Sequence, residues 1–288
     1  MSLERFSKRG KLPAPVQKTI KTVLFIGEQS LCPTKGSRGA VFAIERLGHR
    51  VIFIPTATVV AGETVFTEAN SNFLKSAGTA FSATDIDAVL VGNLYSEDQA
   101  TLTEQLLRDF VAVNTSLKTL LSVSAVRELH LAGHTDSLGQ ICSYLIGDMK
   151  SISNYANFPA DCEAELIAAA RSLEIERVLI TNAPAMRRNS HSYLLVGPSG
   201  STSVEHSKVP GSDFDYGYLL EALMLVRLLE GQRDEDALKV SAASVFELAA
   251  KSVRMGAQEL LYSQNQEALI RPMALVNDRR VVEGSIPK

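Results

Sequence analysis

Two aspartates lie in a loop that could carry phosphoryl-transfer chemistry. The segment Pro210–Tyr218 contains Asp213 and Asp215 and leads into the strongly apolar run Tyr218–Glu230. Such a run predicts a buried helix, and the first backbone N–H groups of a buried helix can bind a phosphate. Either carboxylate could accept the proton of a substrate hydroxyl as that hydroxyl attacks a phosphoryl group. The motif alone favours a second interpretation, in which Asp213 or Asp215 only caps the helix.

A set of residues for binding phosphate or nucleotide follows from the same loop. Ligands of open α/β sheets bind beyond the carboxyl ends of the strands, so residues at or just after the ends of predicted strands are the candidates for ligand binding. Glycine lets the backbone approach a phosphate closely. We therefore expect nucleotide or phosphate contacts from Gly211, Ser212 and Gly217 in the loop, and from Thr181 at the end of a predicted strand.

A second glycine-containing segment could also cradle an anion. Gly36, Ser37 and Gly39 precede a predicted helix, and Lys35 and Arg38 would supply positive charge. The spacing is not that of a Walker A motif, which needs its Lys-Ser/Thr after the second glycine. A turn followed by a helix with Ser37 as its N-cap is the favoured interpretation.

Other polar clusters favour structural roles. His130 and His134 are spaced for zinc on a helix face with Asp136 following, but Gly133 weakens that helix and no third ligand is evident. We therefore predict loop histidines and no metal site. The pair at positions 187 and 188 is Arg-Arg, which could cover a nucleotide or form a solvated turn.

The elements that must position these residues alternate between strand and helix. Short apolar runs predict strands at 22–26, 50–54, 87–91, 117–123 and 177–181, and periodic runs predict helices at 39–47, 97–113, 161–173, 218–230 and 234–255. The turn at 197–200 predicts an antiparallel hairpin from 191–197 and 203–209. The pattern predicts a doubly wound α/β fold whose mostly parallel sheet has helices on both faces and a hairpin toward the C-terminal half. The five single strands should be parallel neighbours.

Composition limits the classes of partner. The chain has 288 residues, 45% of them hydrophobic, and its 29 basic and 32 acidic residues give a net charge of −3. Because basic and acidic residues are nearly equal in number, nucleic acid or an anionic membrane is disfavoured as a partner, and a small molecule is favoured. We expect residues 1–20 to form a basic flexible tail and 21–288 a single domain.

The compartment is expected to be the cytoplasm. The three cysteines are an odd number with no CxxC pair, and no apolar run reaches the length of a membrane span. Targeting to an organelle by the basic N-terminal segment is the minority alternative.

Several strings, in this order, resemble the pyridoxal kinase family of the ribokinase superfamily. They are Ala43–Gly48 with the strand end Pro55–Thr56, the loop Gly92–Gln99, and Tyr218–Gly231, which is similar to that family's C-terminal helix. The resemblance extends over Thr22–Glu267. It implies a ribokinase-like fold, a homodimer, and Mg²⁺-dependent transfer of the ATP γ-phosphate to the 5′-hydroxyl of pyridoxal, pyridoxine or pyridoxamine.

The family's functional positions are mostly changed in this sequence. The catalytic aspartate of the family's GxGD string falls on Tyr218, and a tyrosine with an ordinary pKa near 10 is a poor base. The residues implied to bind the substrate fall on Glu28, or on Ser30 after a shift, and on Thr56 and Asn93.

Three further motifs of the family are absent. Its SNH-like string falls on Val60–Gly62 and its DPV-like string on about Val123–Ala125, and no TPN-like string occurs in Ser153–Phe158. Phosphoryl transfer depends on positioned charges, so these changes together argue against efficient kinase chemistry.

Three hypotheses follow. The first is a pyridoxal kinase-like protein that is weakly active or inactive and binds a ligand or a protein partner. The second is a working pyridoxal kinase that uses ATP and Mg²⁺ with Asp215 or Asp213 as the base. The third, which ranks lower, is a ribokinase-like enzyme for another hydroxymethyl substrate.

Overall fold

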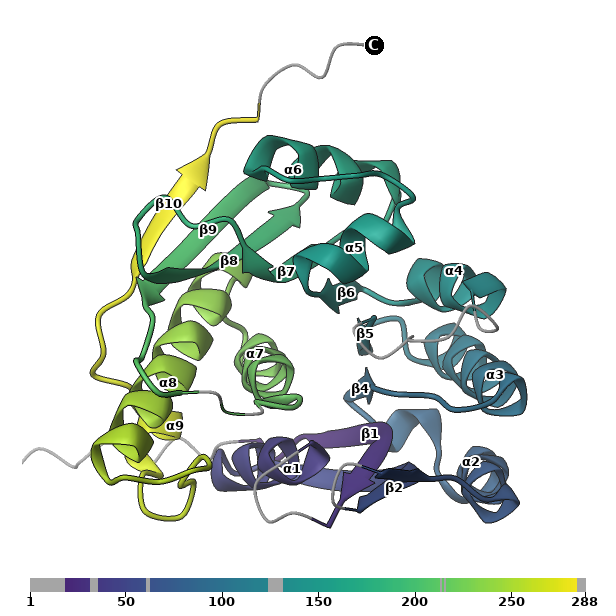
Figure 1. The fold of residues 1–288 in the computed structure, drawn as a ribbon. Coiled ribbons are helices and arrows are strands. Elements are labelled where there is room, and N and C mark those ends of the chain that lie inside the picture. Colours follow the sequence, from purple (N-terminus) through teal and green to yellow (C-terminus); the bar gives the residue numbers. More distant parts are fainter. Residues whose placement is uncertain are drawn as a thin grey trace, which may run out of the picture.

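The computed structural model describes most of the chain as alternating strands and helices (Figure 1). The described residues are 19–31, 36–60, 63–123, 132–212, 214 and 216–283, with backbone only for residues 68 and 132–135. The strands are β1 (Thr22–Ser30), β2 (Arg50–Val60), β3 (Glu63–Val65), β4 (Ala88–Val91), β5 (Lys118–Ser122), β6 (Tyr144–Gly147), β7 (Val178–Ala183), β8 (Ser190–Gly197), β9 (Gly200–Ser207) and β10 (Asn277–Val281). The helices are α1 (Ser37–Arg46), α2 (Glu68–Ala80), α3 (Glu97–Val113), α4 (Ala132–Ile141), α5 (Met149–Tyr155), α6 (Glu163–Ser172), α7 (Leu219–Leu229), α8 (Asp234–Arg254) and α9 (Glu267–Ile270), with a 3₁₀ turn at Ala83–Asp85.

All described strands belong to one sheet of order β10-β9-β8-β7-β6-β5-β4-β1-β2-β3. The six strands from β7 to β2 are parallel, whereas β8, β9 and β10 on one side and β3 on the other pair antiparallel. The parallel strands therefore share one edge at which their carboxyl ends meet, and that edge is where ligands of such sheets bind.

Two hydrophobic cores lie on opposite faces of the sheet. Val23 and Phe25 of β1 face one core, with α1, α7, α8 and α9, and Leu24 and Ile26 face the other, with α2 to α6. Figure 1 shows these two groups of helices on opposite sides of the curved sheet. Because both faces of each central strand are covered, these strands are apolar at every position, and the sequence shows them as continuous runs.

The predicted fold class is confirmed, with one error of adjacency. All five predicted strands are parallel, but β6 separates β5 from β7 and was not predicted. β6 has only four residues, too few for an apolar run to stand out beside its neighbours. The predicted hairpin forms as β8 and β9. Its second strand, β9, spans Gly200–Ser207 in place of the predicted 203–209.

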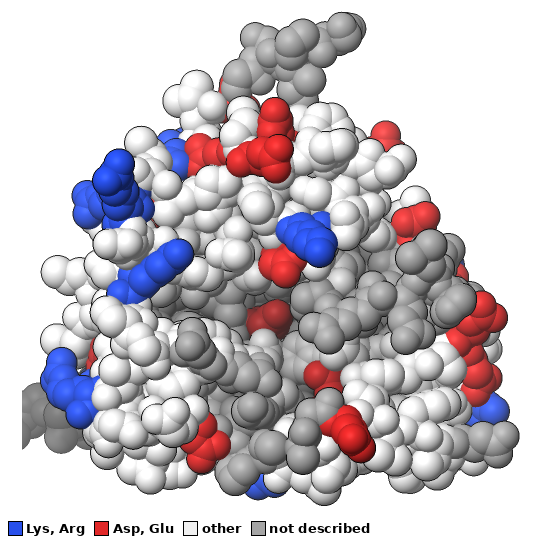
Figure 2. All heavy atoms as spheres, in the orientation of Figure 1, with Lys and Arg blue, Asp and Glu red and all other residues white. Residues whose placement is uncertain are grey.

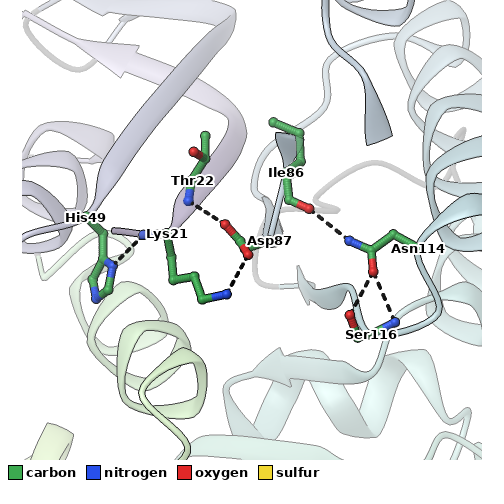
Figure 3. Close-up of polar contacts among 7 residues, drawn as sticks. All are labelled: Lys21, Thr22, His49, Ile86, Asp87, Asn114 and Ser116. Carbon is green, nitrogen blue, oxygen red and sulfur yellow. Dashed lines mark hydrogen bonds and ion pairs between the residues drawn. The ribbon is translucent and has the colours of Figure 1, made fainter. Parts of the chain in front are cut away.

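The amino ends of β1 and β4 are joined by a polar network (Figure 3). The Asp87 carboxylate accepts hydrogen bonds from the Thr22 backbone N–H and from the Lys21 ammonium group, each at 2.8 Å. Close by, the Asn114 side chain donates to the Ile86 carbonyl at 3.0 Å. These contacts bind the start of the central strand to its neighbour at the edge opposite the carboxyl ends.

Asp87→Ala is expected to lower the free energy of unfolding by about 1–2 kcal/mol, because the buried Thr22 N–H loses its acceptor. A drop of the thermal midpoint by a few degrees would show this. Asp85→Ala, an exposed position two residues earlier, is the control and should change stability by less than about 0.5 kcal/mol. Equal effects of the two substitutions would contradict the role of Asp87.

Candidate functional site

A cavity of about 450 Å³ opens at the carboxyl ends of β6 and β7. Asp148 follows β6 and caps α5, its carboxylate accepting from the Ser151 N–H at 2.6 Å, and Thr181 belongs to β7. The remaining walls come from β8, β9, the segment between β9 and α7, the first turn of α7, and Val245 of α8. The face drawn in Figure 2 is hollowed near its centre, and acidic surface is visible in the hollow.

The four residues expected to bind phosphate or nucleotide all line this cavity. Gly211, Ser212 and Gly217 come from the segment before α7, and Thr181 faces them from β7. Asp213 and Asp215, the candidate bases, lie outside the described residues, although Ser212 and Tyr216 beside them are in the wall. The structure thus brings the predicted anion-binding residues together from two segments about 30 residues apart.

Burial governs the charges of the other cavity residues. It lowers the pKa of His191 to about 4, with the neighbouring His206 adding to the effect, and it also lowers the pKa of His206. Both imidazoles are therefore neutral at pH 7. Burial raises the pKa of Glu221, in the first turn of α7, to about 7. Lys208 supplies a cation from an exposed position on the rim.

Sequence reasoning missed these residues, although the sequence contained their signals. His191 and His206 lie at equal distances from the turn at 197–200, and the hairpin pairs them directly. Glu221 is the one acidic residue inside the apolar run before its last position, and a helix buried on all sides must bury it too. Asp148 could not be found because the strand before it was not predicted.

Tyr218 occupies the centre of the neighbouring part of the carboxyl edge. Its side chain is 4% exposed and packs edge-on against Phe25 of β1 with ring centres 5.2 Å apart. Its hydroxyl donates to the Glu28 carboxylate at 2.6 Å and accepts from the Asn93 backbone N–H at 2.9 Å. Burial, followed by the nearby Glu28 carboxyl, holds the pKa of Tyr218 well above its ordinary value of 10, and burial also raises the pKa of Glu28.

The residues implied to bind a substrate gather around this tyrosine and not around the cavity. The Thr56 hydroxyl donates to the Asn93 carbonyl at 2.6 Å, so Glu28, Asn93 and Thr56 form a chain of hydrogen bonds with Tyr218. Ser30 is buried at the end of β1, near Gly36. We call Tyr218, Glu28, Asn93 and Thr56 the tyrosine network.

Two glycines make room for this arrangement. A Cβ atom on Gly92 would lie 2.6 Å from the Tyr218 ring, so glycine after β4 is required for the ring to fit. At Gly217, where φ is 50°, a Cβ atom would lie 2.4 Å from the Gly36 carbonyl oxygen. The two segments that sequence analysis singled out for anions are therefore in close backbone contact.

The remaining candidates occupy ordinary structural positions. Gly36, not Ser37, is the N-cap of α1, so the expected Ser37 cap is wrong; Ser37 is already the first helical residue. The arginines at 187 and 188 are exposed in the turn between β7 and β8 and do not line the cavity. His130 lies outside the described residues. His134 belongs by its backbone to α4, so the prediction of a loop is wrong there, and its side chain lies outside the described residues. Over the described part of the chain, no three His, Cys, Asp or Glu side chains are placed to hold a metal, and no helix could span a membrane.

Solved structures with the same architecture are numerous, whereas comparison of the sequence with family models and with curated proteins gives no match. The pyridoxal kinase of Entamoeba histolytica superposes with a TM-score of 0.80 at 14% identity, over 91% of this chain and 100% of that chain. The Trypanosoma brucei enzyme gives 0.80 at 15% identity with the same coverage. The Leishmania donovani enzyme in complex with ADP and pyridoxamine gives 0.79 at 14% identity, over 91% of this chain and 100% of that chain.

This chain has the ribokinase-like fold of the pyridoxal kinases. The resemblance identified from a few strings is therefore confirmed at the level of the fold. Within this pyridoxal kinase fold, the carboxyl edge of the sheet has two parts: an open cavity beside β6 and β7, and the tyrosine network beside β1, β2 and β4.

Glu221→Gln is expected to make stability less dependent on pH. Because the pKa of Glu221 is raised from 4.5 to about 7, its contribution to stability is complete below pH 4.5 and is lost as the pH rises through about 7. The variant lacks this loss, so its free energy of unfolding relative to wild type should rise by about 1–3 kcal/mol between pH 5 and pH 8. Thermal midpoints at both pH values measure it, with the exposed Glu45→Gln as control. A difference that stays constant across this range would contradict the burial of the carboxyl group.

Tyr218→Phe is expected to lower the free energy of unfolding by about 1–3 kcal/mol. The variant keeps the ring but removes the hydrogen bond that the hydroxyl donates to Glu28 and the one that it accepts from the Asn93 N–H. In a Glu28→Gln background the same substitution should cost less, and the difference in thermal midpoints between the two backgrounds measures the coupling. Additive effects would show that the two side chains do not interact.

Proposed function

We propose that this protein binds a nucleotide or a related phosphorylated ligand and has weak or no pyridoxal kinase activity. Its role is then that of a binding or partner protein that retains the fold of a kinase. The proposal rests on a difference between the two parts of the carboxyl edge: the tyrosine network is closed by its own hydrogen bonds, whereas the cavity is open.

The tyrosine network is the observation that carries the proposal. By the resemblance, Tyr218 stands where the family has its catalytic aspartate. A general base needs a pKa near the working pH, and the pKa of Tyr218 lies well above 10. Its hydroxyl proton is donated to Glu28, so the phenol is already engaged as a hydrogen-bond donor.

The implied substrate residues are also occupied. The Glu28 carboxylate, the Thr56 hydroxyl, and the backbone N–H and carbonyl of Asn93 each have a partner within the network at 2.6–2.9 Å. Opening this network for a pyridoxal ring would leave buried polar groups without partners, which costs about 1–3 kcal/mol each.

The cavity, in contrast, retains what an anionic ligand needs. The α7 N-terminus carries partial positive charge, Lys208 adds a cation, and Gly217 allows the backbone to approach a phosphate. Mg²⁺ bound with a nucleotide uses one or two carboxylates together with phosphate oxygens, and Asp148 on the cavity wall fits that role. Such a Mg²⁺ ion would neutralise phosphate charge.

An ADP-release assay with pyridoxal, pyridoxine and pyridoxamine tests the proposal together with nucleotide titration. Kinases turn over at about 1–100 s⁻¹, and we expect rates at least about a thousandfold lower, with nucleotide binding retained. Turnover in the kinase range would overturn the absence of activity. Failure to bind any nucleotide would overturn the binding role.

The second candidate is a working kinase with Asp215 or Asp213 as base, and it is favoured by the position of Ser212 and Tyr216 in the cavity wall beside these aspartates. On that hypothesis Asp215→Asn abolishes phosphorylation and changes nucleotide affinity by less than about tenfold. On the leading hypothesis the same variant leaves the low turnover unchanged. The N-cap of α7 is Tyr218, so the interpretation of Asp213 or Asp215 as the N-cap is wrong. The homodimer stays a prediction, to be checked by sedimentation at micromolar concentration.

A further inference from the structure

A row of three side-chain rings crosses the β8–β9 hairpin. His206 of β9 and His191 of β8 are directly paired in the hairpin, with ring centres 5.3 Å apart and ring planes 33° apart. His206 also stacks on Phe246 of α8, with ring centres 4.7 Å apart and planes 23° apart. Because His206 contacts both of the other rings, it is the middle ring of the row, and His191 is at one end.

The two imidazole rings are held in place by the backbone. The Nδ1 atom of His206 donates a hydrogen bond to the Ser207 carbonyl at 2.9 Å, since a carbonyl oxygen can only accept. His191 donates one ring N–H to the Thr181 carbonyl. Tyr193 packs edge-on against His191, with ring centres 4.7 Å apart. Rings whose orientation is fixed in advance lose little conformational entropy when a ligand binds.

The cavity extends beyond the His191 end of the row. His191 and His206 both line it. In the sheet, β8 is followed by β7 and then β6, and at these strands the cavity is lined by Thr181 and by Asp148. Neighbouring strands lie about 4.8 Å apart, which is close to the spacing of the rings. A planar ring placed in the cavity beside His191 would therefore continue the row above the next strand.

The cavity wall around His191 suits an uncharged aromatic ring. Both imidazoles are neutral at pH 7, because burial lowers their pKa values. The aliphatic side chains of Val209, Leu220 and Val245 also line the cavity. Pockets with aromatic and aliphatic walls are typical of sites that bury a planar ligand group, and every nucleic acid base has a face that can stack on an aromatic side chain.

On this basis, and resting on the proposed nucleotide binding, we infer that the base of the nucleotide stacks on His191 and that the site prefers purine to pyrimidine nucleotides. A purine has two fused rings and covers more of the imidazole than a single pyrimidine ring does. His191 is then the residue that determines the preference, and the row behind it supports its ring from His206.

Calorimetric titration of the full chain with ADP, CDP and inorganic diphosphate, at one Mg²⁺ concentration, tests this inference. Stacking of a base on an aromatic side chain strengthens binding by about 5- to 150-fold. We therefore expect ADP to bind at least about tenfold more tightly than inorganic diphosphate, with CDP between them. Binding of CDP as tight as that of ADP would overturn the inference and leave the proposed nucleotide binding intact. Binding of none of the three would overturn both.

Substitution of His191 assigns the stacking to that residue. His191→Ala removes the aromatic face and should weaken ADP binding by about tenfold or more, without weakening the binding of inorganic diphosphate. His191→Phe keeps an aromatic face and should retain the preference for ADP over CDP.

The matched control is Phe42→Leu on α1, which removes a ring that packs on Tyr262 and does not line the cavity. This variant should bind ADP as wild type does. Wild-type affinity for ADP in His191→Ala, with unchanged far-ultraviolet circular dichroism, would show that the base does not stack on His191. Equal weakening of ADP and inorganic diphosphate in that variant would also contradict the inference.

Discussion

The burial of α7 is the constraint on which the carboxyl edge of this protein depends. The helix is apolar on nearly all sides and packs beneath the sheet against α1 and α8, so its first residues must lie inside the protein. Tyr218, Gly217 and Glu221 are consequently fixed in place by packing that has nothing to do with their own chemistry. One helix therefore determines both the tyrosine network and a wall of the cavity.

The two parts of the carboxyl edge differ because of the hydrogen-bonding capacity of the side chains there. In the tyrosine network, a phenol links a carboxylate to a backbone N–H, so each buried polar group finds a partner within the protein. In the cavity, the carboxyl group of Glu221 is buried, and its hydrogen bond among the described residues comes from its own backbone N–H. Buried polar groups are stable when satisfied, so the first part is closed by its own contacts and the second is suited to a ligand.

One fold can carry either a closed hydrogen-bond network or an open cavity at the carboxyl edge, because a fold fixes where strands end and not which side chains follow them. The kinase of Leishmania donovani was solved with ADP and pyridoxamine, whereas this chain at 14% identity places a tyrosine and a glutamate together beside β1. Identity this low shows that the backbone arrangement tolerates extensive change of sequence.

The sequence by itself determined the alternation of strands and helices, the buried helix α7 and the hairpin, because continuous apolar runs and helical periodicity are local signals. It also predicts that an anion binds at the segment before α7, since a buried helix must present its N–H groups inside the protein. It did not reveal β6, whose four residues are too short for a pattern. Only the tertiary structure decided that the tyrosine at position 218 reaches the glutamate after the first strand, 190 residues away in sequence. That contact, like the cavity formed by β7, β9 and α7, is made by the long-range packing of side chains that no local pattern encodes.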